Sequence, residues 1–407
     1  MSKPMNLIRL LSIFAVLLLI SSAAIAQPAT GTVKRMSLKS TVLGEERIIL
    51  VRTPPGYETN NVKYPVLYMT DGDAHMGHTA STIEFLTRNG RISDLIVVGV
   101  TNTDRTRDLT PAKSSDKNAA GELRFPTSGG ADNFLKFFQT ELIPEIEKDY
   151  RVQPYRIFAG HSLGGLFAIH AMMTKPGLFN SYVAVSPSLQ WENFEALKRA
   201  EDFLKNQKEL NVTLFVSLGN EPGAIGESFD KFREALAKSN IKGFEWQAER
   251  MSDEDHGSVV LRSHYFGLRK VYADWQAPRD QKSGAVLGGL KGVDAHYAKL
   301  SGRFGYSIPA PEGLINQIGY QYLFDGKPED AIATFKANVE RYPKSANVYD
   351  SLAEAYEQGG RIDLAEPLYE KASTIGAENN DPNAALFKAN YERAHTKLVE
   401  AQSKKQK

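Results

Sequence analysis

The chain has 407 residues, of which 42% are hydrophobic and 24% are charged. This is ordinary globular composition, and it excludes wholesale disorder, a collagen-like chain and a coiled coil. The 49 Lys and Arg residues nearly balance the 48 Asp and Glu residues, so the chain lacks the basic excess expected of a nucleic-acid-binding protein. The absence of cysteine excludes disulfides, thiol catalysis and zinc sites built from cysteine.

The first residues have the pattern of a secretory signal peptide. Lys3 and Arg9 precede an apolar run over residues 10–20, and a small-residue segment then ends at Ala26. This run is shorter than the ~20 apolar residues of a membrane-spanning helix, which favours cleavage over an uncleaved anchor. We therefore expect residues 1–26 to be removed. The mature protein would then be periplasmic or secreted, with no membrane span.

Short apolar runs alternate with segments of helical spacing over residues 27–275. Several of the runs are continuous rather than alternating, as in strands that are buried on both faces. Strand–helix–strand repetition predicts an α/β domain, a doubly wound and mostly parallel sheet with helices on both faces. A hairpin over residues 33–52 is expected to lead into this sheet. The predicted strands are residues 64–69, 95–100, 156–159, 182–185, 212–216 and 244–251.

Residues 276–310 contain several glycines and prolines, and they predict a linker with a short helix near His296. Residues 311–407 have only helical patterns, and part of this segment repeats with an offset of 34 residues. This period matches the tetratricopeptide repeat, so we expect a small all-α domain. Two repeats are fewer than the usual three. Either a degraded third helix pair around residues 381–399 or docking onto the first domain is expected to cover the open end. The repeated pairs are Tyr322/Tyr356, Gly326/Gly360, Ala331/Ala365 and Phe335/Tyr369.

The candidate nucleophile is Ser162, which lies in a Gly-x-Ser-x-Gly motif formed with Gly160 and Gly164. An apolar strand precedes the motif and an Ala/Leu-rich helix follows it, as a nucleophile elbow requires. At such a sharp turn the glycines allow close backbone approach, and the serine is exposed near a helix N-terminus. A capping serine at a glycine-rich helix start is the alternative.

Serine is a weak nucleophile and needs a base nearby. In an α/β-hydrolase the chain order is serine, acid, histidine. His256 fits this order because it lies in a loop just after the predicted strand 244–251, and His264 is the reserve candidate. A solvated loop histidine is the alternative.

The acid is expected after the preceding strand, in a loop that contains Glu221. A carboxylate there would hold the imidazole tautomer and offset its charge. Glu227 and Asp230 compete with Glu221, and so does a dyad without an acid. For the oxyanion hole, the N–H of Leu163 and that of Asp73 are the candidate donors.

Five segments together resemble the family known as "putative esterase", in the branch related to enterochelin (siderophore) esterases. Feruloyl esterases and mycolyltransferases are more distant relatives. The resemblance covers roughly residues 33–275 and implies an α/β-hydrolase fold, an acyl-serine mechanism, and neither cofactor nor metal. In the mycolyltransferases the residue after Asp-Gly supplies an oxyanion N–H, which supports Asp73. The segments are residues 64–73, 105–111, 160–165, 186–191 and 255–258.

The signal-peptide pattern, the Gly-x-Ser-x-Gly motif and this resemblance together lead us to expect an exported serine esterase. Its substrate would be a small-molecule or carbohydrate-linked ester, either of the siderophore type or an aryl, feruloyl or acetyl ester. Arg105 and Arg107 are candidate substrate-binding residues, because an iron–catecholate complex is anionic, and Trp191 is a further candidate. A structural or solvent-facing role for the arginine loop is the alternative. Two rival functions remain: an acyltransferase that uses the same acyl-enzyme, and a scaffold that binds protein partners or itself through residues 311–407.

Overall fold

The computed structural model describes residues 31–405, so the predicted signal peptide lies outside the described residues. Residues 31–276 and residues 277–405 form two compact units, each of which is considered by itself. Within residues 31–405, no helix is both long and apolar enough to cross a bilayer.

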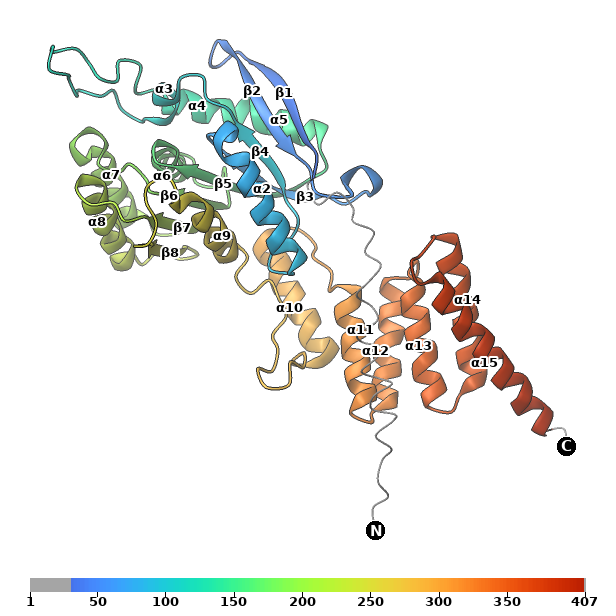
Figure 1. Ribbon diagram of the computed structural model, residues 1–407. Coiled ribbons are helices and arrows are strands. Elements are labelled where there is room, and N and C mark those ends of the chain that lie inside the picture. Colours follow the sequence, from blue (N-terminus) through green and yellow to red (C-terminus); the bar gives the residue numbers. More distant parts are fainter. Residues whose placement is uncertain (1–30, 406–407) are drawn as a thin grey trace. The chain divides into compact units, whose positions relative to one another are not determined.

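An eight-stranded mixed sheet forms the centre of the first unit (Figure 1). Its order is β1-β2-β4-β3-β5-β6-β7-β8; β2 is antiparallel to both of its neighbours, and the strands from β4 to β8 run parallel. The predicted α/β class and the predicted N-terminal hairpin are therefore confirmed. The strands are β1 (Val33–Ser40), β2 (Glu45–Arg52), β3 (Tyr64–Met69), β4 (Ile96–Val100), β5 (Val152–His161), β6 (Ser181–Val185), β7 (Thr213–Leu218) and β8 (Glu245–Arg250).

Helices cover both faces of this sheet. Tyr182 and Leu214 share a buried cluster with α6 and α8 residues. Their neighbours Val183 and Phe215 point to the other face, where α9 packs so closely that a Cβ at Gly267 would lie 2.7 Å from Val183 Cγ1. The continuous apolar runs thus reflect burial on two faces. The helical elements are η2 (Tyr57–Thr59), α2 (Gly72–Arg88), α3 (Arg105–Leu109), α4 (Ala131–Phe137), η3 (Phe138–Leu142), α5 (Ile143–Asp149), α6 (Leu163–Thr174), α7 (Trp191–Asn206), α8 (Ala224–Lys238) and α9 (Val259–Val271).

The second unit is helical among its described residues. Where a linker with a short helix was expected, the structure has the sixteen-residue helix α10. A single helix, α15, replaces the expected third helix pair, and it places Ala394 and Phe387 among the buried residues of this unit. The helices are α10 (Gly289–Phe304), α11 (Glu312–Phe324), α12 (Pro328–Arg341), α13 (Ala346–Gln358), α14 (Ile362–Glu378) and α15 (Ala384–Lys405).

The 34-residue repeat has a structural counterpart in this unit. Gly326 and Gly360 occupy equivalent turns with φ of 71° and 74°, a left-handed conformation that glycine adopts without strain. At the residue directly before α12 and before α14 the same backbone hydrogen bond recurs, from Lys327 N–H to Tyr322 O at 2.8 Å and from Arg361 N–H to Tyr356 O at 2.9 Å. The helix hairpins α11–α12 and α13–α14 are therefore built alike.

The carboxyl ends of the parallel strands define where the chemistry can lie. In open α/β sheets, ligands bind just beyond these ends. Thr70 follows β3, Ser162 follows β5, Gly219 follows β7 and Met251 follows β8. The predicted catalytic loops therefore all leave the same edge of the sheet.

Candidate active site

Ser162 occupies a strained turn between β5 and α6. Its φ of 59° and ψ of −113° are rare for a residue with a side chain. The turn is held by a hydrogen bond from Ser162 N–H to Val185 O at 2.9 Å. No side chain would fit at Gly160, because a Cβ there would lie 2.2 Å from Gly164 O. This is the geometry of a nucleophile elbow.

His256 and Glu221 are hydrogen-bonded to each other through His256 Nδ1 and Glu221 Oε2. Glu221 is only 8% exposed, and its Oε1 accepts hydrogen bonds from Ser186 Oγ at 2.6 Å and from Gly219 N–H at 3.1 Å. Burial by itself would raise the pKa of Glu221, but the hydrogen bonds from His256 and Ser186 outweigh it and lower the pKa. The carboxylate is therefore held ionised against the imidazole.

The candidate base, His256, lies beside the elbow, and among the described residues it makes no hydrogen bond to Ser162. The His256 ring is 4.5 Å, between centroids, from the ring of His161, which directly precedes Ser162. In the part of the chain that the structure describes, Ser162 Oγ has one side-chain contact, with Ser188 Oγ at 3.4 Å. Hydrogen bonds between catalytic groups are often long without substrate and tighten when substrate binds.

The rival candidates are engaged elsewhere. Asp230 pairs with Arg250 at 3.0 Å, and the exposed Glu227 pairs with Lys231 at 2.7 Å. His264 is buried and its Nδ1 lies 2.8 Å from Thr79 Oγ1. The structure thus brings His256 to Glu221 rather than to these carboxylates.

The two predicted oxyanion donors stand at the beginnings of two helices. Leu163 is the first residue of α6, and Asp73 is the second residue of α2. Among the described residues, neither N–H donates a hydrogen bond to the protein. The start of α6 packs against the turn that precedes α2, since a Cβ at Gly164 would lie 2.3 Å from Thr70 Oγ1. Free N–H groups at helix N-termini are suited to stabilise a developing oxyanion.

Arg105 joins the turn after β3 to the elbow. Its Nε donates to Asp71 Oδ1 at 2.6 Å and its Nη2 to His161 O at 2.9 Å. Asn102 Nδ2 also donates to Asp71 Oδ1, at 2.7 Å. Burial acts to raise the pKa of Asp71, but the hydrogen bonds and charge of Arg105 outweigh it and lower the pKa. This arginine is thus already paired with a carboxylate of the protein.

The other two candidate substrate-binding residues also have partners within the protein. Arg107 contacts Glu45 at 2.6 Å and Asp108 at 2.8 Å. Trp191 donates its indole N–H to Ala112 O at 3.0 Å, and its ring lies 5.3 Å from that of Phe125. Both guanidinium charges are therefore balanced by protein carboxylates, while the indole ring is held in place beside the loop of residues 110–130.

A group of histidines lies near the elbow, and the sequence motifs did not predict it. The ring of His75 lies 5.7 Å from that of His161, and the rings of His78 and His264 are 5.6 Å apart. Burial, together with the charges of His256 and His75, lowers the pKa of His161 to about 4. Within the described residues, no group of three or more histidine, aspartate and glutamate side chains is arranged to hold a metal. These imidazoles are therefore neutral packing groups near neutral pH.

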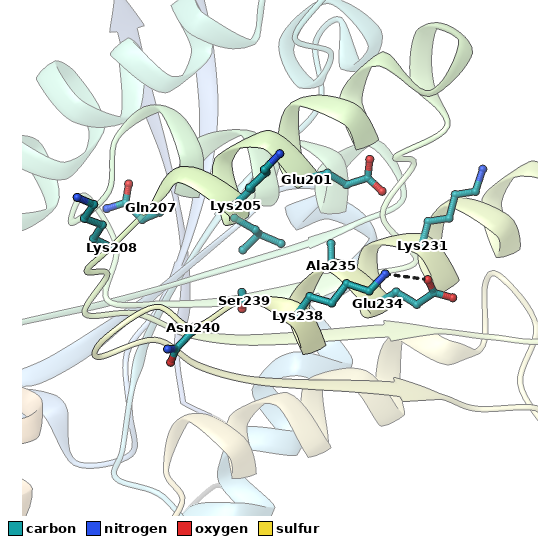
Figure 2. A pocket seen from close by; sticks show the side chains of 11 residues that line it. Glu201, Lys205, Gln207, Lys208, Lys231, Glu234, Ala235, Lys238, Ser239 and Asn240 are labelled. Carbon is teal, nitrogen blue, oxygen red and sulfur yellow. Dashed lines mark ion pairs between the residues drawn. The ribbon is translucent and has the colours of Figure 1, made fainter.

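Two surface hollows lie away from the predicted catalytic residues. One, of about 600 Å³, opens between α7 and α8 (Figure 2). The other, of about 700 Å³, lies between α2 and α9 and is lined by Phe85 and Tyr265 among others. Neither is lined by Ser162, Glu221 or His256. The charged side chains of the first are Glu201, Lys205, Lys208, Lys231, Glu234 and Lys238.

The comparisons with known proteins agree with this fold and these motifs. A family model described as "Putative esterase" matches residues 40–276, more than half of the chain. Ferri-bacillibactin esterase BesA of Bacillus subtilis (strain 168) is 30% identical over 217 residues, which cover 48% of this chain and 75% of that protein. The siderophore enterobactin esterase of Emericella nidulans is 34% identical over 239 residues, covering 48% and 77%.

A solved structure extends the likeness to three dimensions. The IroE-like serine hydrolase from Shewanella oneidensis is 27% identical, with a TM-score of 0.66, and the match covers 76% of this chain and 100% of that chain. The fold and the site thus define a carboxylic ester hydrolase. The chain belongs to the esterase family that the matching model describes.

Proposed function

We propose that this protein is an exported serine esterase that works through an acyl-serine intermediate. The observation that carries the proposal is the hydrogen bond between the buried Glu221 and the partly exposed His256, whose ring lies beside the strained turn at Ser162. Ser162 Oγ attacks the ester carbonyl while His256 accepts its proton, and Glu221 stabilises the imidazolium. The N–H groups of Leu163 and Asp73 receive the oxyanion.

The second half of the reaction uses the same groups. His256 gives its proton to the leaving alcohol, which departs and leaves the acyl group on Ser162. Water then enters, His256 takes its proton, and the hydroxide attacks the acyl carbonyl. Collapse of this second tetrahedral intermediate frees the acid and returns the proton to Ser162 Oγ. Protein residues supply every proton-transfer group in this scheme.

For the substrate we propose an ester of the siderophore type, with aryl, feruloyl or acetyl esters as the other classes to be tested. The relatives named above as siderophore esterases support this choice. Arg105 and Arg107 support it less, because each is already paired with a protein carboxylate. Trp191 is the candidate that remains for contact with an aromatic group.

Export is proposed from the sequence of residues 1–26, with cleavage after Ala26 and a periplasmic or secreted product.

For residues 311–407 we propose a tetratricopeptide-type array that binds a protein partner or a second copy of the chain. The matched turns at Gly326 and Gly360 support the array. Light scattering on the purified protein separates self-association from a monomer that needs another partner.

The test of the esterase proposal is hydrolysis of a p-nitrophenyl ester by the wild-type protein and by Ser162→Ala, followed by a panel of catechol, feruloyl and acetyl esters. We expect the wild type to hydrolyse the simple ester and Ser162→Ala to be inactive while its circular dichroism spectrum is unchanged. Products are also analysed with an added alcohol acceptor. Transfer that dominates over hydrolysis would make the protein an acyltransferase, and an inactive wild type would favour a scaffold.

A further inference from the structure

The turn between β6 and α7 lies inside the candidate site but has no role in the mechanism above. Ser186, the first residue after β6, is wholly buried at 0% exposure. Its φ of 42° is in the left-handed region that residues with side chains seldom occupy. Its N–H donates to Ser217 O on β7 at 2.8 Å, which fixes the backbone of the turn. Strain of this kind persists where surrounding contacts enforce it, and it is concentrated at functional sites.

The side chain of Ser186 reaches the acid of the proposed triad. Its hydroxyl donates to Glu221 Oε1 at 2.6 Å, and the other oxygen, Oε2, faces His256 Nδ1. The N–H of Gly219 donates to the same Oε1 at the longer distance of 3.1 Å. Each carboxylate oxygen is thus committed to a different partner, which leaves Glu221 one orientation toward the imidazole.

The other end of the turn reaches the nucleophile. Ser188 N–H donates to Ser162 O at 3.2 Å, and Ser188 Oγ lies 3.4 Å from Ser162 Oγ. Between the two serines, Pro187 packs against the start of α6, since a Cβ at Gly165 would lie 2.9 Å from Pro187 Cα. Three consecutive residues therefore contact the acid, the nucleophile's helix and the nucleophile.

We propose that Ser186 is a positioning residue of the esterase, whose hydroxyl holds Glu221 in the orientation that serves His256. Ser186 acts through Glu221 and does not itself touch the reacting atoms. The proposal rests on the serine-esterase function proposed above and adds to it a residue that the family motifs do not explain. Ser188 keeps the same turn attached to the nucleophile, so that the acid and the nucleophile are held by one segment.

The first test compares two substitutions that remove the same hydroxyl. Ser186→Ala keeps the left-handed strain and Ser186→Gly relieves it. A hydrogen bond to a charged group contributes enough that its loss should lower kcat for a p-nitrophenyl ester about 10-fold to 100-fold. We expect this loss in both variants, with KM little changed, although their stabilities differ. The proposal would be overturned if kcat changed in parallel with the stability of the two variants, so that Ser186→Gly retained wild-type kcat.

Ser181→Ala is the matched control. Ser181 is also wholly buried and begins the same strand, β6, at its opposite end. Its hydroxyl is hydrogen-bonded to Tyr155 OH. This contact lies at the opposite end of β6 from Ser186, which contacts Glu221. The control therefore loses a buried hydrogen bond without loosening the acid, and we expect lower stability with wild-type kcat. If Ser181→Ala lowered kcat as much as Ser186→Ala, the effect would be general loss of packing and the proposal would be wrong.

A double-mutant cycle with Glu221→Ala gives the sharper readout. If Ser186 acts through Glu221, then Ser186→Ala should change kcat less than about 3-fold once Glu221 is absent. A further loss of 10-fold or more in that background would contradict the proposal. Failure of the underlying function looks different: Ser162→Ala would then keep wild-type activity. If Ser162→Ala and Glu221→Ala are inactive or nearly so while both Ser186 variants keep wild-type kcat, the function stands and the positioning role is refuted.

Discussion

Both units have turns in which glycine adopts a positive φ, but the sheet unit also places residues with side chains in this conformation at the edge of its sheet. In residues 277–405 the turns between repeated helices use glycine, with φ of 71° at Gly326 and 74° at Gly360. In residues 31–276, residues with side chains adopt positive φ at the sheet edge where the proposed chemistry lies: 53° at Asp71, 59° at Ser162 and 42° at Ser186. Glycine adopts this conformation freely, whereas the other residues are held there at an energetic cost.

The difference distinguishes turns that only connect helices from turns that carry residues of the candidate site. A turn that only reverses the chain is most stable with glycine, and the two repeated helix hairpins follow that rule, whereas Asn380, between α14 and α15, has a φ of 50°. Asp71, Ser162 and Ser186 each carry a side chain that makes a specific contact, with Arg105, Ser188 and Glu221 respectively. At these three positions the strained residue therefore carries a side chain that contacts another group of the candidate site. Positive φ at Glu192, Asn193, Phe194 and Asp274 lies outside the proposed reaction. Substitutions at both kinds of turn and at their partners test that assignment, and loss of the proposed base should have the greatest effect.

His256→Ala should lower kcat for a p-nitrophenyl ester about 10⁶-fold, because the base of a serine triad costs about as much to remove as the nucleophile. His395→Ala in the helical unit is the control. His395 is paired with Glu366 at 2.7 Å, and its loss should leave kcat unchanged. If the two variants had comparable activity, a histidine at the sheet edge would matter no more for catalysis than one in the helical unit.

Glu221→Ala should lower kcat about 10⁴-fold, less than loss of the histidine, because oxyanion stabilisation and the base itself remain. Asp230→Ala serves as the comparison, since Asp230 is paired with Arg250 and should be dispensable for catalysis. If Asp230→Ala lost activity and Glu221→Ala kept it, the acid would be misassigned.

Gly164→Ala should lower kcat about 10²-fold to 10³-fold, the loss expected when an oxyanion donor is displaced. The added methyl group would lie 2.3 Å from Thr70 Oγ1 and push the start of α6, which carries one donor, away from the turn that leads to the other. The added methyl of Gly77→Ala, within α2, meets nothing within 4 Å and provides the control. Equal activity in these two alanine variants would argue against an oxyanion hole at this junction.

Acid should destabilise the first unit through His161. Burial and its histidine neighbours lower its pKa in the folded protein to about 4 from the ordinary 6.5. Between these values the unfolded chain binds more protons, so the free energy of unfolding falls as the pH drops from about 6.5 toward 4. Urea denaturation of the wild type and of His161→Gln over this range measures the effect. The free energy of unfolding should depend less strongly on pH in His161→Gln than in the wild type. An identical pH dependence in the two proteins would show that His161 is not the cause.

Gly326→Ala should have the smallest effect and only on stability. A left-handed residue with a side chain costs about 1–2 kcal/mol, and no neighbour would meet the new methyl group within 4 Å. Gly313→Ala, which also meets nothing and has no positive φ, is the control for the added methyl alone. Unfolding curves should separate the two variants while kcat stays at the wild-type value in both. Loss of esterase activity in folded Gly326→Ala would show that the helical unit takes part in the chemistry.

The sequence predicted those parts of the molecule that local pattern determines. Continuous apolar runs predicted the parallel strands because burial on two faces leaves no alternation. The Gly-x-Ser-x-Gly motif pointed to Ser162 because the sharp turn itself requires glycines on either side. Chain order then led to Glu221 and His256, which the structure places in hydrogen-bond contact.

What the sequence did not reveal depends on contacts between distant residues. Nothing near Arg107 in the chain shows that Glu45 balances its charge, and nothing near Arg105 points to Asp71. Ser186 stood in a family motif without a role, because its partner Glu221 is 35 residues away. The C-terminal segment was expected as a helix pair, but no breaker interrupts α15 after residue 384, and one long helix forms.

The most direct test of the central claim is covalent labelling with a fluorophosphonate, followed by peptide mapping of the modified residue. If Ser162 is the nucleophile, one adduct per chain should form, on Ser162. The labelling rate should fall steeply in His256→Ala, because the imidazole activates the hydroxyl. An adduct on another serine, or ester hydrolysis that continues at the wild-type rate with Ser162 unlabelled, would contradict this claim.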